Sequence, residues 1–137
     1  MRKRTKAREC ALKILYQIDI TKGNYEDSIR MFWEKEPAPE QSIREFAVRL
    51  VKGVMENFEE IDRAISGYAV NWQISRMAVI DRNVLRMAAF ELLYMDDIPR
   101  KVSINEAVDA AKKYGDKDSG KFVNGILDKI NKMKTAE

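Results

Sequence analysis

Apolar side chains recur with helical spacing along almost the whole of this 137-residue chain. Between Ile43 and Val54 they stand three or four residues apart, as on one face of an amphipathic helix. The segment from Val123 to Ile130 repeats this pattern. No segment sustains the alternation of apolar and polar residues that a half-buried strand requires. The sequence therefore predicts an all-α protein.

The periodic segments predict about seven helices, whose ends are marked by proline, glycine and capping residues. Pro37 and Pro39 are expected to end the second helix, and Gly115 to cap a later one. Two pairs have the spacing of capping boxes that open helices. These pairs are Asn57 with Glu60 and Ser103 with Glu106.

A break in the pattern at residues 71–75 divides the chain into two packed helical subdomains. We expect one domain of residues 1–137 without a long linker. Within it we expect a basic arm at 1–8 leading into the first helix, an N-terminal half at 9–70 and a C-terminal half at 71–137.

The positive charge of the chain is concentrated at its N-terminus. The chain has 25 basic and 22 acidic residues, and five of the basic ones stand in the first eight positions without an acid among them. The rest therefore has 20 basic and 22 acidic residues, a balance of −2. A basic arm on a slightly acidic body is a frequent footprint of nucleic-acid binding. A solvated terminus without function is the alternative, and composition does not decide between them.

The residue counts argue against several classes of site. With one cysteine and no histidine, the chain can form neither an internal disulfide nor a Cys/His zinc site. Most nucleophile–base catalysis uses histidine, and no phosphate-binding glycine loop is present, so we expect no enzyme, cofactor or metal. No apolar run approaches the ~20 residues of a membrane span. The expected location is the cytoplasm.

Phe122 is the aromatic residue that fits the core pattern least well. It lies roughly 90° from the centre of the buried stripe of the last helix. Spacing favours packing at the edge of the core. The alternative is a surface ring that stacks an RNA base while Lys117 and Lys121 meet phosphates.

Charged residues also interrupt the apolar segment before residue 92. Asp81, Arg82, Arg86 and Glu91 are interpreted from spacing as an ordinary solvated face with i, i+4 pairs. Trp72 is expected to fill the core.

Four segments resemble blocks of the NusB family of transcription antitermination factors. They lie in register at 8–16, 72–92, 98–112 and 121–128. The resemblance covers roughly the whole chain and is weakest at 21–41. The last block, which reads Lys-Phe-Val-Asn-Gly-Ile-Leu-Asp, is the most specific. A related module begins some RNA cytosine methyltransferases. Since no such domain follows here, we expect the free-standing factor.

The resemblance implies an all-helical protein with two subdomains that binds RNA and has no enzymatic activity. Family members bind the single-stranded boxA element of nascent ribosomal RNA transcripts together with NusE, a ribosomal protein. The pair helps load a complex that keeps RNA polymerase from terminating early. Some members form homodimers that mask the RNA surface. The alternative is a helical protein-interaction adaptor without specific RNA binding.

The resemblance also assigns residues, and it shifts Phe122 towards an RNA contact. The implied RNA-binding residues are Arg2, Lys3, Arg4, Lys6, Arg8, Asp118, Lys121 and Phe122. The implied partner-binding residues are Asp81, Arg82 and Glu91.

Overall fold

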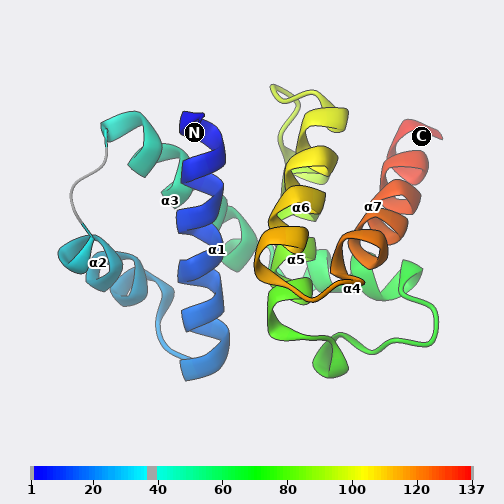
Figure 1. Cartoon of the computed structure of the whole chain (residues 1–137), viewed down its shortest axis with the longest axis horizontal. Coiled ribbons are helices and arrows are strands. Elements are labelled where there is room, and N and C mark those ends of the chain that lie inside the picture. Colours follow the sequence, from blue (N-terminus) through cyan, green and yellow to red (C-terminus); the bar gives the residue numbers. More distant parts are fainter. Residues whose placement is uncertain (1, 37–39, 137) are drawn as a thin grey trace. The chain divides into compact units, whose positions relative to one another are not determined.

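The computed structural model describes residues 2–36 and 40–136, and within them the chain is all-α, as predicted (Figure 1). The described residues form seven α-helices and one short 3₁₀ helix. They divide into two compact units, Met1–Glu56 and Asn57–Glu137. The division falls earlier than the expected boundary between residues 70 and 71, because the fourth helix packs with the second unit.

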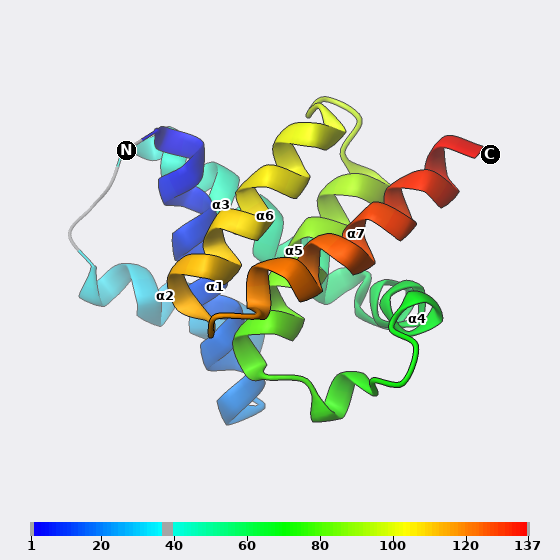
Figure 2. The same cartoon turned by 45° about the vertical axis from the view of Figure 1, so that its right-hand side comes forward.

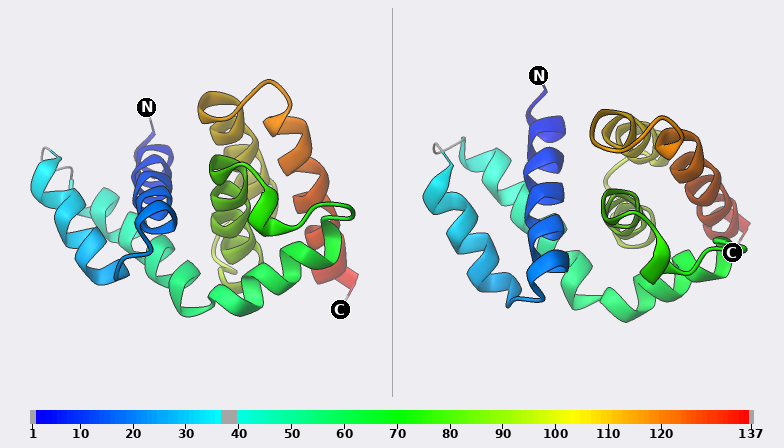
Figure 3. Two further views of the ribbon diagram at one scale, coloured as in Figure 1. Left: turned by 90° about the horizontal axis from the view of Figure 1, so that it is seen from below. Right: turned by 60° about the horizontal axis from the view of Figure 1, so that its bottom comes forward.

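The N-terminal unit consists of α1 (Lys3–Thr21), α2 (Tyr25–Lys35) and α3 (Gln41–Glu56). α1 and α3 pack against each other (Figure 3). Both helices bury apolar stripes, whereas α2 buries only Ile29. α1 ends at Lys22, which adopts a left-handed conformation with φ 58°. Asn24 then opens α2, since its side chain accepts a hydrogen bond from the Asp27 N–H. Pro37 and Pro39 lie outside the described residues.

The C-terminal unit consists of α4 (Phe58–Tyr68), the 3₁₀ helix η1 (Ile74–Arg76), α5 (Val79–Tyr94), α6 (Arg100–Tyr114) and α7 (Ser119–Ala136). α5 is its central helix and packs against α4, α6 and α7 (Figure 2). Because α5 has neighbours on several sides, its charged residues are enclosed together with its apolar ones.

This enclosure shows that the solvated-face interpretation of α5 is wrong. Arg86 is 6% exposed and forms two hydrogen bonds with the carboxylate of Asp62, at 2.8 and 3.1 Å. Its guanidinium also lies 4.5 Å from the ring centroid of Phe58. Glu91 is 2% exposed and accepts a 2.7 Å hydrogen bond from the Ser103 hydroxyl. Buried charges need such partners, and here they join α5 to α4 and α6.

The two predicted capping boxes do not open helices in the expected way. α6 begins at Arg100, with Pro99 at its N-cap, so Ser103 lies inside the helix. Asn57 is the N-cap of α4, but its side chain makes no capping hydrogen bond. The prediction for Gly115 is confirmed, since it is the C-cap of α6.

No helix in the part of the chain that the structure describes is both long enough and apolar enough to cross a membrane.

Candidate nucleic-acid interface

The basic arm is the beginning of a helix. α1 begins at Lys3 with Arg2 as its N-cap, so the arm presents its cations from a regular scaffold. Four of the five predicted RNA-binding cations of the arm are exposed, namely Arg2, Lys3, Arg4 and Lys6. Arg8 is only 4% exposed, which argues against a phosphate contact by its side chain in this conformation.

Phe46 of α3 positions two arginines of the arm. The guanidinium carbon of Arg4 lies 4.5 Å from the centroid of the Phe46 ring, and that of Arg8 lies 5.3 Å from it. Cation–π contacts of this kind are worth about 0.5–1 kcal/mol at exposed sites. Because the ring already orders Arg4, this exposed guanidinium loses less conformational freedom when it binds an anion.

A groove of about 410 Å³ runs between the arm and α3. We call it the arm groove. Its lining residues are Lys3, Arg4, Ser42, Glu45, Phe46 and Arg49. Three cations therefore face one carboxylate, although Lys3 also pairs with Glu40 outside the lining, at 2.7 Å. The groove is positively charged and suits a phosphate-bearing ligand.

The other predicted RNA-binding residues lie in the C-terminal unit, where α6 leads into α7. Asp116 forms a tight turn there, because its carboxylate accepts a 2.9 Å hydrogen bond from the Asp118 N–H. The Asp118 carbonyl accepts a hydrogen bond from the Phe122 N–H, which places Asp118 at the start of α7. Lys121 is exposed beside them.

Phe122 is half-buried and packs edge to face against Trp72, with the ring centroids 5.8 Å apart. Trp72 is 55% exposed, so the prediction that it fills the core is wrong. The two rings border a pocket of about 240 Å³, which we call the aromatic pocket. Its lining residues are Trp72, Met77, Ala78, Asp81, Asp116, Asp118, Ser119 and Phe122.

Asp81 brings a predicted partner-binding residue into the same pocket as Asp118 and Phe122. Its side chain is 8% exposed, and its Oδ1 has no hydrogen-bond partner among the described residues. A buried carboxylate oxygen without a donor is costly, so a ligand with an N–H or O–H group would satisfy it. Three carboxylates repel phosphate, so the aromatic pocket suits a nucleobase edge or a cationic side chain.

The remaining partner-binding predictions fall on residues with roles inside the C-terminal unit. Arg82 donates to the backbone carbonyls of Ile74, Ser75 and Met77, at 3.4–3.5 Å, and so fastens η1 to α5. Glu91 is buried against Ser103 and presents no surface to a partner. Of the three residues, Asp81 lines the aromatic pocket, and Arg82 and Glu91 do not.

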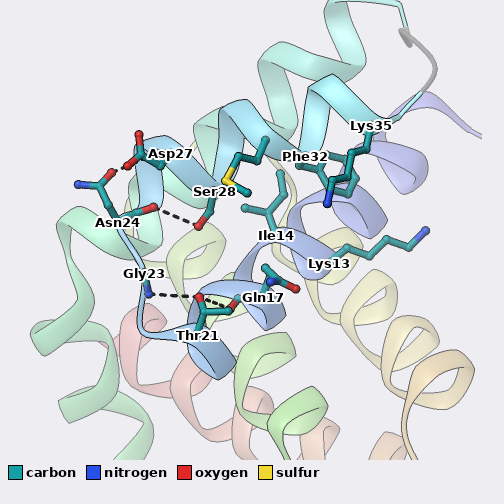
Figure 4. Close-up of a pocket in the computed structure, with 11 residues that line it drawn as sticks. Lys13, Ile14, Gln17, Thr21, Gly23, Asn24, Asp27, Ser28, Phe32 and Lys35 are labelled. Atoms are coloured by element: carbon teal, nitrogen blue, oxygen red, sulfur yellow. Dashed lines mark hydrogen bonds between the residues drawn. The ribbon is translucent and has the colours of Figure 1, made fainter.

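A further cavity, of about 520 Å³, lies between α1 and α2 and contains none of the predicted site residues (Figure 4). Ile14 and Phe32 contribute apolar surface, and Lys13 and Lys35 extend at one side of it. The polar groups beside the α1–α2 turn bond to one another, as Ser28 does to the Asn24 carbonyl.

Comparison with known proteins fits this arrangement. The sequence model of the NusB family matches residues 5–132. The chain belongs to the NusB family. It is 54% identical over 127 residues to the transcription antitermination protein NusB of Trichlorobacter lovleyi. The aligned region covers 93% of this chain and 89% of that protein.

Solved structures of NusB proteins share the fold. T. maritima NusB has a TM-score of 0.87 and 38% identity, and the match covers 98% of this chain and 97% of that one. A crystal structure of antitermination factors NusB and NusE in complex with dsRNA contains a chain with a TM-score of 0.89 and 32% identity. That match covers 97% of this chain and 98% of the other.

Several residues of these surfaces were not predicted from the sequence. Phe46 was assigned only to the apolar stripe of its helix, and Arg49 is an exposed cation like many others. The i, i+4 spacing of Arg4 and Arg8 was the available signal, since it places both guanidinium groups on one helix face, where a single ring can contact them. Trp72 stood in the predicted break, where core packing was not required.

Proposed function

We propose that this chain is a transcription antitermination factor that binds single-stranded boxA-type RNA of nascent ribosomal RNA transcripts together with NusE. The RNA–protein complex then helps RNA polymerase avoid premature termination, in the cytoplasm. The chain acts by binding and catalyses no reaction. The observation that carries the proposal is the helical basic arm, whose exposed cations are set beside a groove with Arg4 held by Phe46.

The two surfaces suit different parts of an RNA. Lys3, Arg4 and the other exposed arm cations attract the phosphate backbone, which supplies affinity without sequence information. Trp72 and Phe122 offer ring surface to an unstacked base, as in other single-strand binders. Asp81 supplies an acceptor in the same pocket, either for a base or for a donor on NusE. Membership of the NusB family and the likeness to a NusB chain bound to NusE and RNA support this assignment.

A gel shift with three RNAs of equal length tests the proposal. They are a boxA-like single strand, a scrambled single strand and a duplex of the boxA-like sequence. We expect the boxA-like strand to bind best. The duplex is included because the related NusB–NusE structure contains dsRNA. Equal binding of the boxA-like and scrambled strands would instead favour a protein-interaction adaptor without specific RNA binding.

A further inference from the structure

The arm groove joins residues from two segments that are far apart in the sequence. α1 contributes Lys3 and Arg4, and α3 contributes Ser42 and Arg49. Both Arg4 and Arg49 are exposed, and the guanidinium of Arg4 forms a cation–π contact with the Phe46 ring. The groove therefore contains a cation and a hydroxyl group that the arm itself does not supply.

We propose that the arm groove is a binding site for an RNA phosphate, in which Arg49 and Ser42 of α3 act together with Lys3 and Arg4 of α1. This inference rests on the proposed RNA binding and extends it to a second helix. Guanidinium, ammonium and hydroxyl groups are the usual donors to phosphate oxygens. The backbone of the bound strand thus follows the contact between α1 and α3.

Two carboxylates near the arm groove repel a bound phosphate, so their removal provides a second test of the proposal. Glu45 lines the groove, and Glu40 holds Lys3 at 2.7 Å when RNA is absent. Both members of the Lys3–Glu40 pair are more than half exposed, so the pair is weak and a phosphate can displace it. Removing the charge of Glu45 should therefore strengthen RNA binding, whereas removing that of Arg49 should weaken it.

The experiment measures the affinity for a short boxA-like single-stranded RNA between 50 and 200 mM salt. Arg49→Gln should lower the affinity about two- to fivefold at 50 mM salt, as expected for one exposed charge contact. It should also reduce the slope of log affinity against log salt by about 0.7. Over this fourfold salt range, the intact chain should consequently lose about 2.6-fold more affinity than the variant.

Arg44→Gln is the matched control. Arg44 is an exposed arginine of the same helix, but its guanidinium lies 5.1 Å from the ring centroid of Trp33 on α2, outside the groove lining. Both variants change the net charge equally. Equal effects of Arg49→Gln and Arg44→Gln would show general charge attraction and would overturn the proposal. Melting curves confirm that each variant is folded.

Glu45→Gln should change the RNA affinity in the opposite direction to Arg49→Gln, with an expected gain of about twofold. Glu34→Gln is its control, because Glu34 lies on α2 and pairs with Arg30. Unchanged or weaker binding of Glu45→Gln would count against a phosphate in the groove. The proposed function has a separate readout, which is the preference for boxA-like over scrambled RNA. If that preference is present and Arg49→Gln behaves as Arg44→Gln does, only the inference about the groove fails.

Discussion

Phe122→Leu separates an RNA contact from a packing contact at the aromatic pocket. Leucine retains apolar volume at this half-buried position but removes the ring. A base stacked on an aromatic ring contributes about 1–3 kcal/mol, so RNA affinity should fall about 5- to 150-fold. The edge-to-face contact with Trp72, at 5.8 Å between centroids, is worth about 0.5–1.5 kcal/mol. The free energy of unfolding should decrease by about that amount.

Two assays on the same preparation measure the two effects. RNA titration gives the change in affinity, and urea unfolding gives the change in stability. Trp72→Leu is a useful companion, because it removes the other ring of the pair while Phe122 remains. If Phe122→Leu binds RNA as the intact chain does and loses only stability, Phe122 is a packing residue. The proposed base contact would then be refuted.

Three further predictions concern groups whose environment the structure defines. Ser103→Ala removes the hydroxyl that donates to buried Glu91, so urea unfolding should show a loss of about 1–3 kcal/mol, and an unchanged stability would contradict the buried hydrogen bond. A hydrogen bond to Glu60 raises the pKa of Tyr94 to about 12. Absorbance at 295 nm should therefore show one phenol ionising near that pH, and the variant Glu60→Gln should lower the pKa of Tyr94. Because the pKa in the folded state is raised, the stabilisation by this contact is complete below about pH 10 and is lost as the pH rises towards 12. Burial raises the pKa of the Cys10 thiol, so iodoacetamide should alkylate it more slowly at pH 7.5 than it alkylates glutathione, and an equal or faster rate would show that this thiol is not protected.

The helices could be predicted from the sequence because their apolar stripes are regular, but their exact ends depended on contacts across the fold. Ser103 illustrates this. Its spacing to Glu106 suggested a capping box, but α6 begins three residues earlier, at Arg100. The Ser103 hydroxyl donates instead to Glu91 of α5, twelve residues away in sequence. A local pattern carries no information about such a partner.

Burial of charge was the feature that spacing predicted least well. Asp81, Arg86 and Glu91 stand between apolar positions, which is also how a solvated face looks in sequence. They are buried because helices surround α5, and two of them find partners on α4 and α6. The unit boundary was misplaced for a related reason, since α4 packs with α5 and α7.

The candidate site was predicted in part. Concentration of charge identified the arm, and family resemblance added Asp118, Lys121 and Phe122. The resemblance alone did not reveal that Asp81 and Phe122 line one pocket, because they lie on different helices, α5 and α7. It also left out Arg49, whose place in the arm groove depends on the packing of α1 against α3.

Coupling between RNA and NusE is the measurement that tests the central claim most directly. A boxA-like single-stranded RNA is titrated into the chain with and without saturating NusE, and NusE is titrated with and without saturating RNA. If both ligands use this chain to form one complex, each should raise the affinity for the other by the same factor, about 5- to 150-fold. Unchanged affinities in both pairs of titrations would show two independent sites and would contradict joint binding of RNA and NusE.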